Sequence, residues 1–217
     1  VGPWAHKYPH FASPEPRIGF LQEATRWWDY WLKGLDTGVL KDSRYAVYLM
    51  SGVRPKTKYD KRDGRWIDGT AVDQKAEKQL WYLGSNQNLE SVSKPHQTIN
   101  VLISSPQDCG MASGEFCSIW LGADMPGDQR SDDAKSACFT SNKLFSTTNI
   151  IGSPKLKLTL QSDKPNAQVA VRLNHIHPDG ASTRITYGVL NLAQRNGHEV
   201  PERLIPGETF EVALNLD

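Results

Sequence analysis

Residues 155–173 read KLKLTLQSDKPNAQVAVRL, and this stretch decides the class of fold. Leu156, Leu158 and Leu160 alternate with polar residues, and the same period of two returns in AQVAVRL over residues 167–173. Alternation of this kind places the apolar side chains on one face of a β-strand. The intervening SDKP contains residue types that favour tight turns. The stretch therefore predicts two consecutive strands, Lys155–Gln161 and Ala167–Leu173, joined by a short turn.

A similar pattern of short strand-like runs and turns extends over most of the chain beyond Gly38. Short β-branched or aromatic runs are separated by polar clusters that contain PDG, NG and PG. Further strands are predicted at Arg44–Met50, Gln79–Leu83, Ser118–Leu121, Ala137–Phe139, Thr183–Leu192 and Thr209–Leu216. The charged segment from Lys56 to Gln79 is expected to be an exposed loop with a short strand around Trp66. Many short strands with regular turns predict a mainly β fold, a jelly-roll β-sandwich.

The amino-terminal part of the chain follows a different pattern. Four prolines prevent a continuous helix before Phe20, namely Pro3, Pro9, Pro14 and Pro16. From Ile18 to Lys33 apolar residues recur at spacings of three and four, and Gly34 follows as a stop signal. This predicts an amphipathic helix whose apolar stripe contains Trp27, Trp28 and Trp31. A tryptophan stripe at helical spacing is expected to pack into a core rather than to stack on a ligand.

The charge balance excludes some classes of partner. The 217 residues carry 25 basic and 24 acidic side chains, with no long block of like charge, so no nucleic-acid partner is expected. No run of eighteen apolar residues occurs, which predicts no membrane span. The first residues lack the basic and apolar regions of a signal peptide. The compartment stays open, with the cytoplasm slightly favoured, because a sorting segment would precede Val1.

Three cysteines leave two readings open. Cys109 and Cys117 lie eight residues apart on either side of GMASG, and either a disulfide closing this loop or two free thiols fit that spacing. Cys138 falls in an apolar run and is expected to be a buried small hydrophobic residue.

The sequence contains no complete set of catalytic or nucleotide-binding motifs. No GxSxG elbow occurs, since GMASG places Ser113 one position late, and no Walker loop or dinucleotide fingerprint is present. His6 and His10 stand four apart in a loop, and His175 and His177 stand two apart on a predicted strand, yet neither pair has a third ligand at a convincing spacing.

Paired acidic residues complete the search for a metal. Asp132 and Asp133 could bind calcium, but solvated loop charge is the preferred interpretation. The sequence therefore predicts neither a metal nor a cofactor.

Motifs along nearly the whole chain are similar to one hydrolase family. VGPWAH at residues 1–6 and RWWDYWLKG at residues 26–34 resemble the signature of the cocaine-esterase and X-prolyl dipeptidyl peptidase family (CocE/NonD). DMPGDQRSDD, SDKPNAQVAVRL, HPDGASTRITYGVLNL and PGETFEV resemble the jelly-roll domain of its acyl esterases and acylases, in the same order. Two departures are His175, where relatives usually have a small or acidic residue, and Gln194, where many have His.

The resemblance implies a division of the chain and a catalytic role. Residues 1–38 would be the carboxyl end of an α/β-hydrolase domain, and residues 39–217 a jelly-roll domain that is incomplete at its carboxyl end. In this family GPW-x-H carries the histidine of a Ser-His-Asp triad, which falls on His6 here. The serine and the aspartate are expected upstream of Val1, so the isolated chain is predicted to be inactive.

The chemistry of imidazole fits this role. A serine hydroxyl needs a base that accepts its proton at neutral pH and returns it to the leaving group. The implied partners are a small ester or amide or a short peptide, the remainder of the hydrolase chain, and a second copy of the chain in a homo-oligomer. Which of these substrates is cleaved stays open.

Two other interpretations compete with catalysis. His6 could be an ordinary loop histidine capped by Trp4. Alternatively, the chain is a non-catalytic jelly-roll module that binds carbohydrate, peptide or a partner protein. Exposed rings on one β face would favour the module, although burial is expected for each of the candidates Trp66, Trp81, Tyr82 and Trp120.

Overall fold

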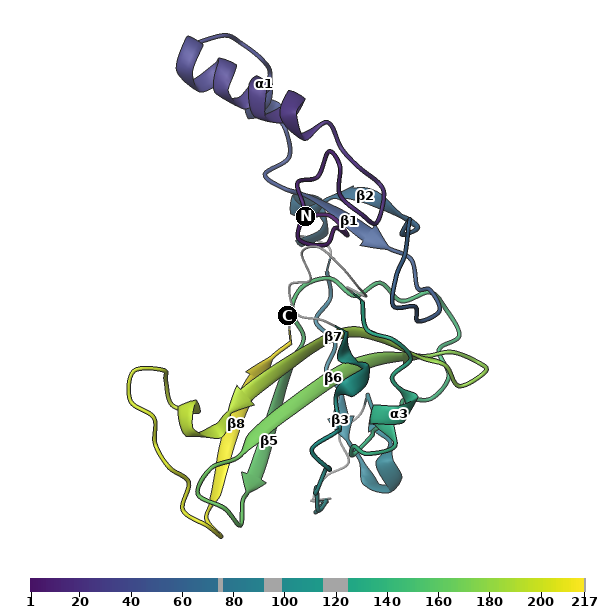
Figure 1. Ribbon diagram of the computed structural model, residues 1–217, viewed down its shortest axis with the longest axis vertical. Coiled ribbons are helices and arrows are strands. Elements are labelled where there is room, and N and C mark those ends of the chain that lie inside the picture. The colour runs from purple at the N-terminus through teal and green to yellow at the C-terminus, as the bar shows by residue number, and fades with distance from the viewer. Residues whose placement is uncertain (74–75, 92–98, 115–124, 217) are drawn as a thin grey trace. The chain divides into compact units, whose positions relative to one another are not determined.

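The computed structural model describes residues 1–73, 76–91, 99–114 and 125–216 (Figure 1). Two compact units divide the chain, the first over residues 1–149 and the second over residues 150–217. The described residues form four antiparallel sheets of two strands each, two sheets in either unit. This confirms the predicted mainly β fold. The predicted boundary between residues 38 and 39 is a different division and stays a prediction.

The second unit consists of two antiparallel ribbons. Strand β5 (Lys155–Gln161) pairs with β8 (Thr209–Asn215), with Leu158 opposite Val212. Strand β6 (Gln168–Ile176) pairs with β7 (Ser182–Asn191), and the register shifts by a bulge between Leu173 and Asn174. All four strands were predicted from period-two alternation, and the bounds of β5 agree with the prediction at both ends.

Apolar side chains from both ribbons meet in one core. Its buried members are Leu192, Leu204 and Val212, and its half-buried members are Leu158, Leu160, Ala167, Val169, Leu190 and Phe210. Strands β7 and β8 approach closely at Gly188, where a Cβ atom would lie 2.4 Å from the Asn215 carbonyl oxygen. A two-layer β-sandwich results, and glycine at position 188 permits the close approach of its layers.

The first unit carries shorter strands. Strand β1 (Ala46–Met50) pairs with β2 (Gly64–Asp68), with Tyr48 opposite Trp66, which confirms the strand expected around Trp66. Strand β3 (Tyr82–Leu83) pairs with β4 (Leu89–Glu90) and is shorter than predicted. Two short α-helices lie in this unit, α2 (Gly69–Asp73) and α3 (Arg130–Asp133). It also contains three single 3₁₀ turns, η1 (Val39–Lys41), η2 (Ser85–Gln87) and η3 (Met111–Ser113). A fourth 3₁₀ turn, η4 (Leu192–Gln194), lies in the second unit.

Two predicted strands of the first unit have different outcomes. Residues 137–139 form no strand, so that prediction is wrong. They directly follow the turn after α3, and the only pairing nearby among the described residues is an isolated bridge between Thr140 and Asn88. Cys138 is accordingly half-buried, and its thiol donates to the Asp133 carbonyl oxygen at 3.2 Å. The strand predicted at 118–121 lies outside the described residues.

Helix α1 (Phe20–Lys33) confirms the helical prediction and its stop signal. Gly34 adopts φ 69°, a left-handed conformation that glycine accepts without strain, and its N–H donates to the Tyr30 carbonyl oxygen at 3.1 Å. Lys33 and Asp29 form an ion pair at 2.7 Å, one turn apart. No helix in the described part of the chain combines the length and apolar character needed to cross a membrane.

The tryptophan stripe of α1 contradicts the expectation of core packing. Trp27, Trp28 and Trp31 are 46%, 54% and 54% exposed, and no residue of α1 is buried. Periodicity shows that a helix has an apolar face, but burial needs a second surface. The described residues of the first unit do not cover this face.

Candidate functional site

His6 is the central residue of a tight three-residue turn. The N–H of Lys7 donates to the Ala5 carbonyl oxygen at 2.6 Å, and the φ angle of His6 is not positive, which describes an inverse γ-turn. The N–H of Ala5 donates in turn to the Ser13 carbonyl oxygen at 3.0 Å. The backbone on both sides of His6 is therefore fixed, while its side chain is exposed.

The preceding residues explain why the motif begins with glycine, proline and tryptophan. A Cβ atom on Gly2 would lie 2.5 Å from the Trp4 ring, so only glycine fits there. The Trp4 indole donates to the Pro16 carbonyl oxygen at 2.7 Å, and its ring centroid lies 6.0 Å from that of Trp66. Pro3 is buried. The apolar residues of the motif thus pack inward, and the histidine projects outward.

Further hydrogen bonds hold this loop to the first unit. The backbone nitrogen of Val1 donates to the Ala46 carbonyl oxygen at 2.7 Å, and the N–H of Tyr48 donates to the Val1 carbonyl oxygen at 2.9 Å. Later in the loop, the N–H of Glu15 donates to the Asp60 carbonyl oxygen at 2.8 Å, and the N–H of Arg62 donates to the Glu15 carbonyl oxygen at 2.8 Å. One end of the loop is therefore attached to strand β1, and the other end to the segment that precedes strand β2.

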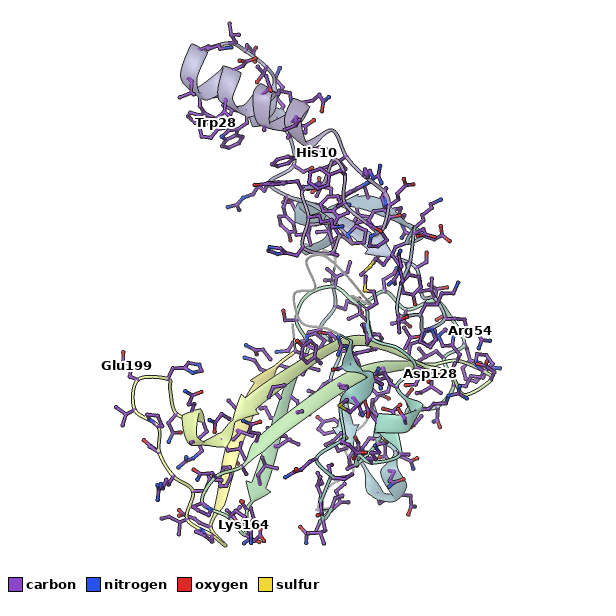
Figure 2. The ribbon with its side chains drawn as sticks, in the orientation of Figure 1. His10, Trp28, Arg54, Asp128, Lys164 and Glu199 are labelled. Carbon is purple, nitrogen blue, oxygen red and sulfur yellow. The ribbon has the colours of Figure 1, made fainter. Side chains whose placement is uncertain are left out.

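His10 differs from His6 in its surroundings. Its ring lies among those of Tyr8, Phe11 and Phe20, with centroid distances between 4.6 and 6.1 Å, where the loop enters α1 (Figure 2). Its Nδ1 atom is buried and has no hydrogen-bond partner among the described residues. His10 thus belongs to an aromatic cluster, whereas the ring of His6 makes no hydrogen bond with any described residue and is available to groups outside them.

The histidine pair of the second unit forms a stack. The ring centroids of His175 and His177 lie 4.2 Å apart, and a 2.9 Å hydrogen bond joins His177 Nε2 to the Thr183 hydroxyl. Over residues 1–73, 76–91, 99–114 and 125–216, no three His, Cys, Asp or Glu side chains gather as a metal site would require. The absence of a metal and of a cofactor stays a prediction.

Asp132 corrects the expectation of solvated loop charge. Its side chain is 1% exposed, and its carboxylate accepts the N–H of Ala112 at 2.9 Å. Gln129, which is fully buried, donates from its amide to the Ala112 carbonyl oxygen at 2.7 Å. Sequence reasoning missed both residues, because a polar DQRSDD run gives no sign of burial. Both side chains hydrogen-bond to the backbone of Ala112 in the η3 turn and so have a structural role.

Two of the three cysteines of the first unit lie in its described part, Cys109 and Cys138. Cys109 forms no disulfide with any described residue, and Cys117 lies outside the described residues. The Cys109 sulfur lies 3.5 Å from the Ser136 hydroxyl. Both readings of the Cys109 and Cys117 spacing therefore stay open.

The aromatic side chains that were considered as a binding surface are more exposed than expected. Trp66, Trp81 and Tyr82 are 39%, 38% and 37% exposed, so the expectation of burial is wrong for these three. Trp66 still packs its ring against Trp4 and Tyr48. Trp120 lies outside the described residues.

Comparison with known proteins identifies a family. Residues 41–217 match the X-Pro dipeptidyl-peptidase C-terminal non-catalytic domain. The match covers most of the chain, so the chain belongs to this family, in agreement with the resemblance of its motifs to the CocE/NonD hydrolases. No curated protein matches the chain. The matched range begins after α1, so His6 lies outside it.

Proposed function

We propose that this member of the X-Pro dipeptidyl-peptidase C-terminal domain family belongs to a serine hydrolase and supplies that enzyme with two parts. The first is His6, as the general base of a Ser-His-Asp triad. The second is the non-catalytic β domain over residues 39–217. The reaction class is hydrolysis of an ester, an acyl amide or an X-prolyl peptide bond through an acyl-enzyme.

One observation supports the role of His6 above all others. Its backbone is held by hydrogen bonds on both sides, while its imidazole is exposed at the apex of the turn. A catalytic base must be fixed in position, and it must also reach a nucleophile. A histidine that only filled space would show the opposite arrangement, as His10 does among its aromatic neighbours.

The proposed mechanism assigns one task to each ring nitrogen. One nitrogen accepts the proton of the serine hydroxyl as the oxygen attacks the carbonyl carbon, and later gives that proton to the departing alcohol or amine. The other nitrogen donates to an aspartate, which holds the ring in the correct tautomer. Serine and aspartate are provided by hydrolase residues other than the described ones.

Helix α1 has a structural task in this proposal. Its exposed face of Trp27, Trp28 and Trp31 is covered by the catalytic domain. Burying such rings stabilises the junction through the loss of apolar surface from water. The helix begins fourteen residues after His6, so its docking also fixes the loop that carries the base.

A serine-directed probe tests the proposal on the complete enzyme. We expect a fluorophosphonate to label the full-length protein. His6→Ala should reduce labelling, and it should lower ester turnover by about 10⁶-fold, as removal of the triad histidine does. His198→Ala is the matched control, because His198 is also exposed but lies in the second unit. Labelling and turnover that survive His6→Ala contradict the proposed role.

A further inference from the structure

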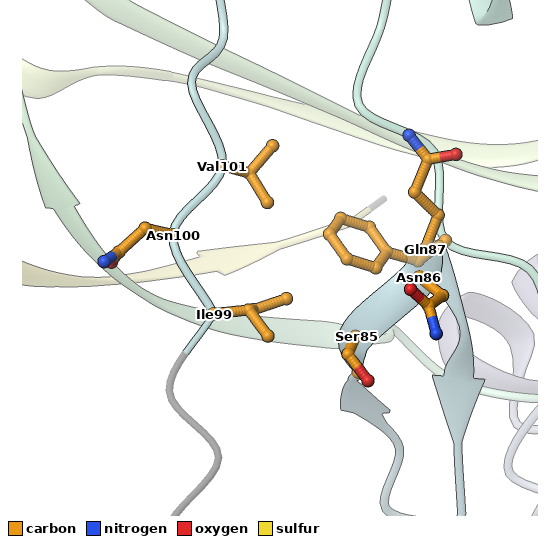
Figure 3. Close-up of a pocket in the computed structure, with 8 residues that line it drawn as sticks. Ser85, Asn86, Gln87, Ile99, Asn100 and Val101 are labelled. Atoms are coloured by element: carbon orange, nitrogen blue, oxygen red, sulfur yellow. The ribbon is translucent and has the colours of Figure 1, made fainter.

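A hollow of about 300 Å³ lies in the first unit, and His6 is not among the residues that line it (Figure 3). One wall is the η2 turn, and the opposite wall is an extended segment whose Ile99 and Val101 side chains are directed toward that turn, while Asn100 points the other way. Six residues supply the lining used below, namely Ser85, Asn86, Gln87, Ile99, Val101 and Phe139.

The turn breaks the usual residue preference of its type. Asn86 has φ 56° and ψ 29°, Gln87 has φ 60°, and the N–H of Asn88 donates to the Ser85 carbonyl oxygen at 3.3 Å. These values describe a type I′ turn, in which glycine is the favoured second central residue. Gln87 occupies that position at a conformational cost. The backbone at position 87 would be most stable with glycine, which has no side chain, yet this chain has a long amide side chain there.

Backbone hydrogen bonds hold two walls of the hollow together. The N–H of Thr140 donates to the Gln87 carbonyl oxygen at 2.8 Å, and the N–H of Leu89 donates to the Thr140 carbonyl oxygen at 2.9 Å. Phe139 directly precedes Thr140, so its ring is held beside the turn. The turn and the Phe139 segment are therefore fixed relative to each other before a ligand binds, which reduces the entropic cost of binding.

The lining determines the chemistry of the ligand. Three apolar residues, Ile99, Val101 and Phe139, line the hollow together with Ser85, Asn86 and Gln87, whose side chains carry a hydroxyl and two amides. None of the described residues that line the hollow is charged, so a charged ligand would lose its hydration without compensation. The volume lies at the lower end of small-molecule pockets, roughly 300–1,000 Å³. The ligand is therefore small, neutral and amphipathic.

We propose that this hollow binds one neutral pyranose unit of a carbohydrate, with its C–H face on Phe139, Ile99 and Val101 and its hydroxyls on Asn86, Gln87 and Ser85. A pyranose combines an apolar ring face with hydroxyl groups that both donate and accept, as the two walls require. The site is separate from the proposed hydrolase activity and does not depend on it.

NMR titration of the full chain with three neutral methyl glycosides tests the site. The probes are methyl β-glucopyranoside, methyl β-galactopyranoside and methyl α-mannopyranoside. We expect at least one to shift the resonances of residues 85–87 and 99–101, with affinity on the order of 1 mM for so small a ligand. Gln87→Gly relieves the turn, so it should keep or raise the unfolding temperature and still weaken binding about tenfold.

A second variant and a control keep the test decisive. Val101→Ser alters the apolar wall at a position that is 47% exposed, so it should fold normally and also weaken binding. Asn166→Ala removes an exposed turn amide of the second unit and should bind like the natural chain. Absence of binding by all three glycosides, or equal binding by Gln87→Gly and Val101→Ser, overturns the proposal. Neither result bears on labelling of the hydrolase by a fluorophosphonate.

Discussion

Helix α1 and the second compact unit both show strong apolar periodicity, but only the second unit buries the side chains concerned. Along β5 and β8, leucine, valine and phenylalanine alternate with polar residues and pack around Leu192 and Leu204. Along α1, the three tryptophans share one face and remain about half exposed. A pattern in the sequence thus predicts an element and its apolar face, whereas burial depends on whether another element meets that face.

The largest effect is expected in the core of the second unit. Leu192→Ala should lower the free energy of unfolding by about 3 kcal/mol, since it removes a side chain that is 4% exposed and leaves a cavity. Urea denaturation followed by circular dichroism measures the change. Ile205→Ala, at a position that is 67% exposed in the same unit, should stay within about 0.5 kcal/mol of the natural chain. Equal losses of stability in both variants would show that burial does not distinguish these two apolar positions.

A smaller effect is expected on α1. Trp28→Gln should change the free energy of unfolding of this chain by no more than about 0.5 kcal/mol, because the ring is more than half exposed. The fluorescence of a dye that binds apolar surface should fall in the same variant. In the proposed full-length hydrolase, where a catalytic domain would cover this face, Trp28→Gln should instead lower the free energy of unfolding by more than about 1 kcal/mol. A loss above about 1 kcal/mol in this chain alone would show that the stripe is already packed.

The smallest effect is expected at a surface ion pair of the first unit. Lys135 Nζ lies 2.7 Å from Asp108 Oδ2, and this hydrogen bond lowers the pKa of the Asp108 carboxyl below its ordinary value and raises the pKa of Lys135 above its own. The lowered pKa of Asp108 means that its contribution to stability is present above the ordinary carboxyl pKa and is lost as the pH falls through the folded value. The raised pKa of Lys135 means that its contribution is present below the ordinary lysine pKa and is lost as the pH rises through the folded value.

Carbon-13 NMR of the Asp108 carboxyl checks this pair. In Lys135→Met the pKa of Asp108 should move up toward its ordinary value, while Lys143→Met, which removes another exposed lysine, should leave it unchanged. Stability should change little in either variant, since both partners lie at the surface. An unchanged Asp108 titration in Lys135→Met would show that the pair does not persist in solution.

The predictions from sequence succeeded where local rules are sufficient. The alternation in residues 155–161 and the stop at Gly34 each describe a preference of the backbone itself, and the structure has both features. The strand predicted at Ala137–Phe139 failed, because three apolar residues satisfy the pattern without a neighbouring strand to pair with. Asp132 and Gln129 were missed for the related reason that burial of a polar side chain depends on partners distant in sequence.

The candidate sites divide in the same way. The order GPWAH pointed to His6 from the sequence alone, and its exposed position on a fixed turn supports the proposed role without testing it. The hollow at the η2 turn could not be foreseen, because Ser85–Gln87, Ile99–Val101 and Phe139 share no motif. One sign was available: an Asn-Gln pair in a hairpin where Asn-Gly is the common choice.

By itself, the sequence determined the elements of this protein: which segments alternate, where the helix ends, and which histidine follows the GPW motif. These properties depend on dihedral preferences and side-chain periodicity over a few residues. Only the tertiary structure decided which apolar faces are covered, that Asp132 is buried, and that a hollow forms beside Gln87. The reason is that burial, hydrogen-bond partners and cavities arise from residues far apart in the chain, whose meeting no local pattern encodes.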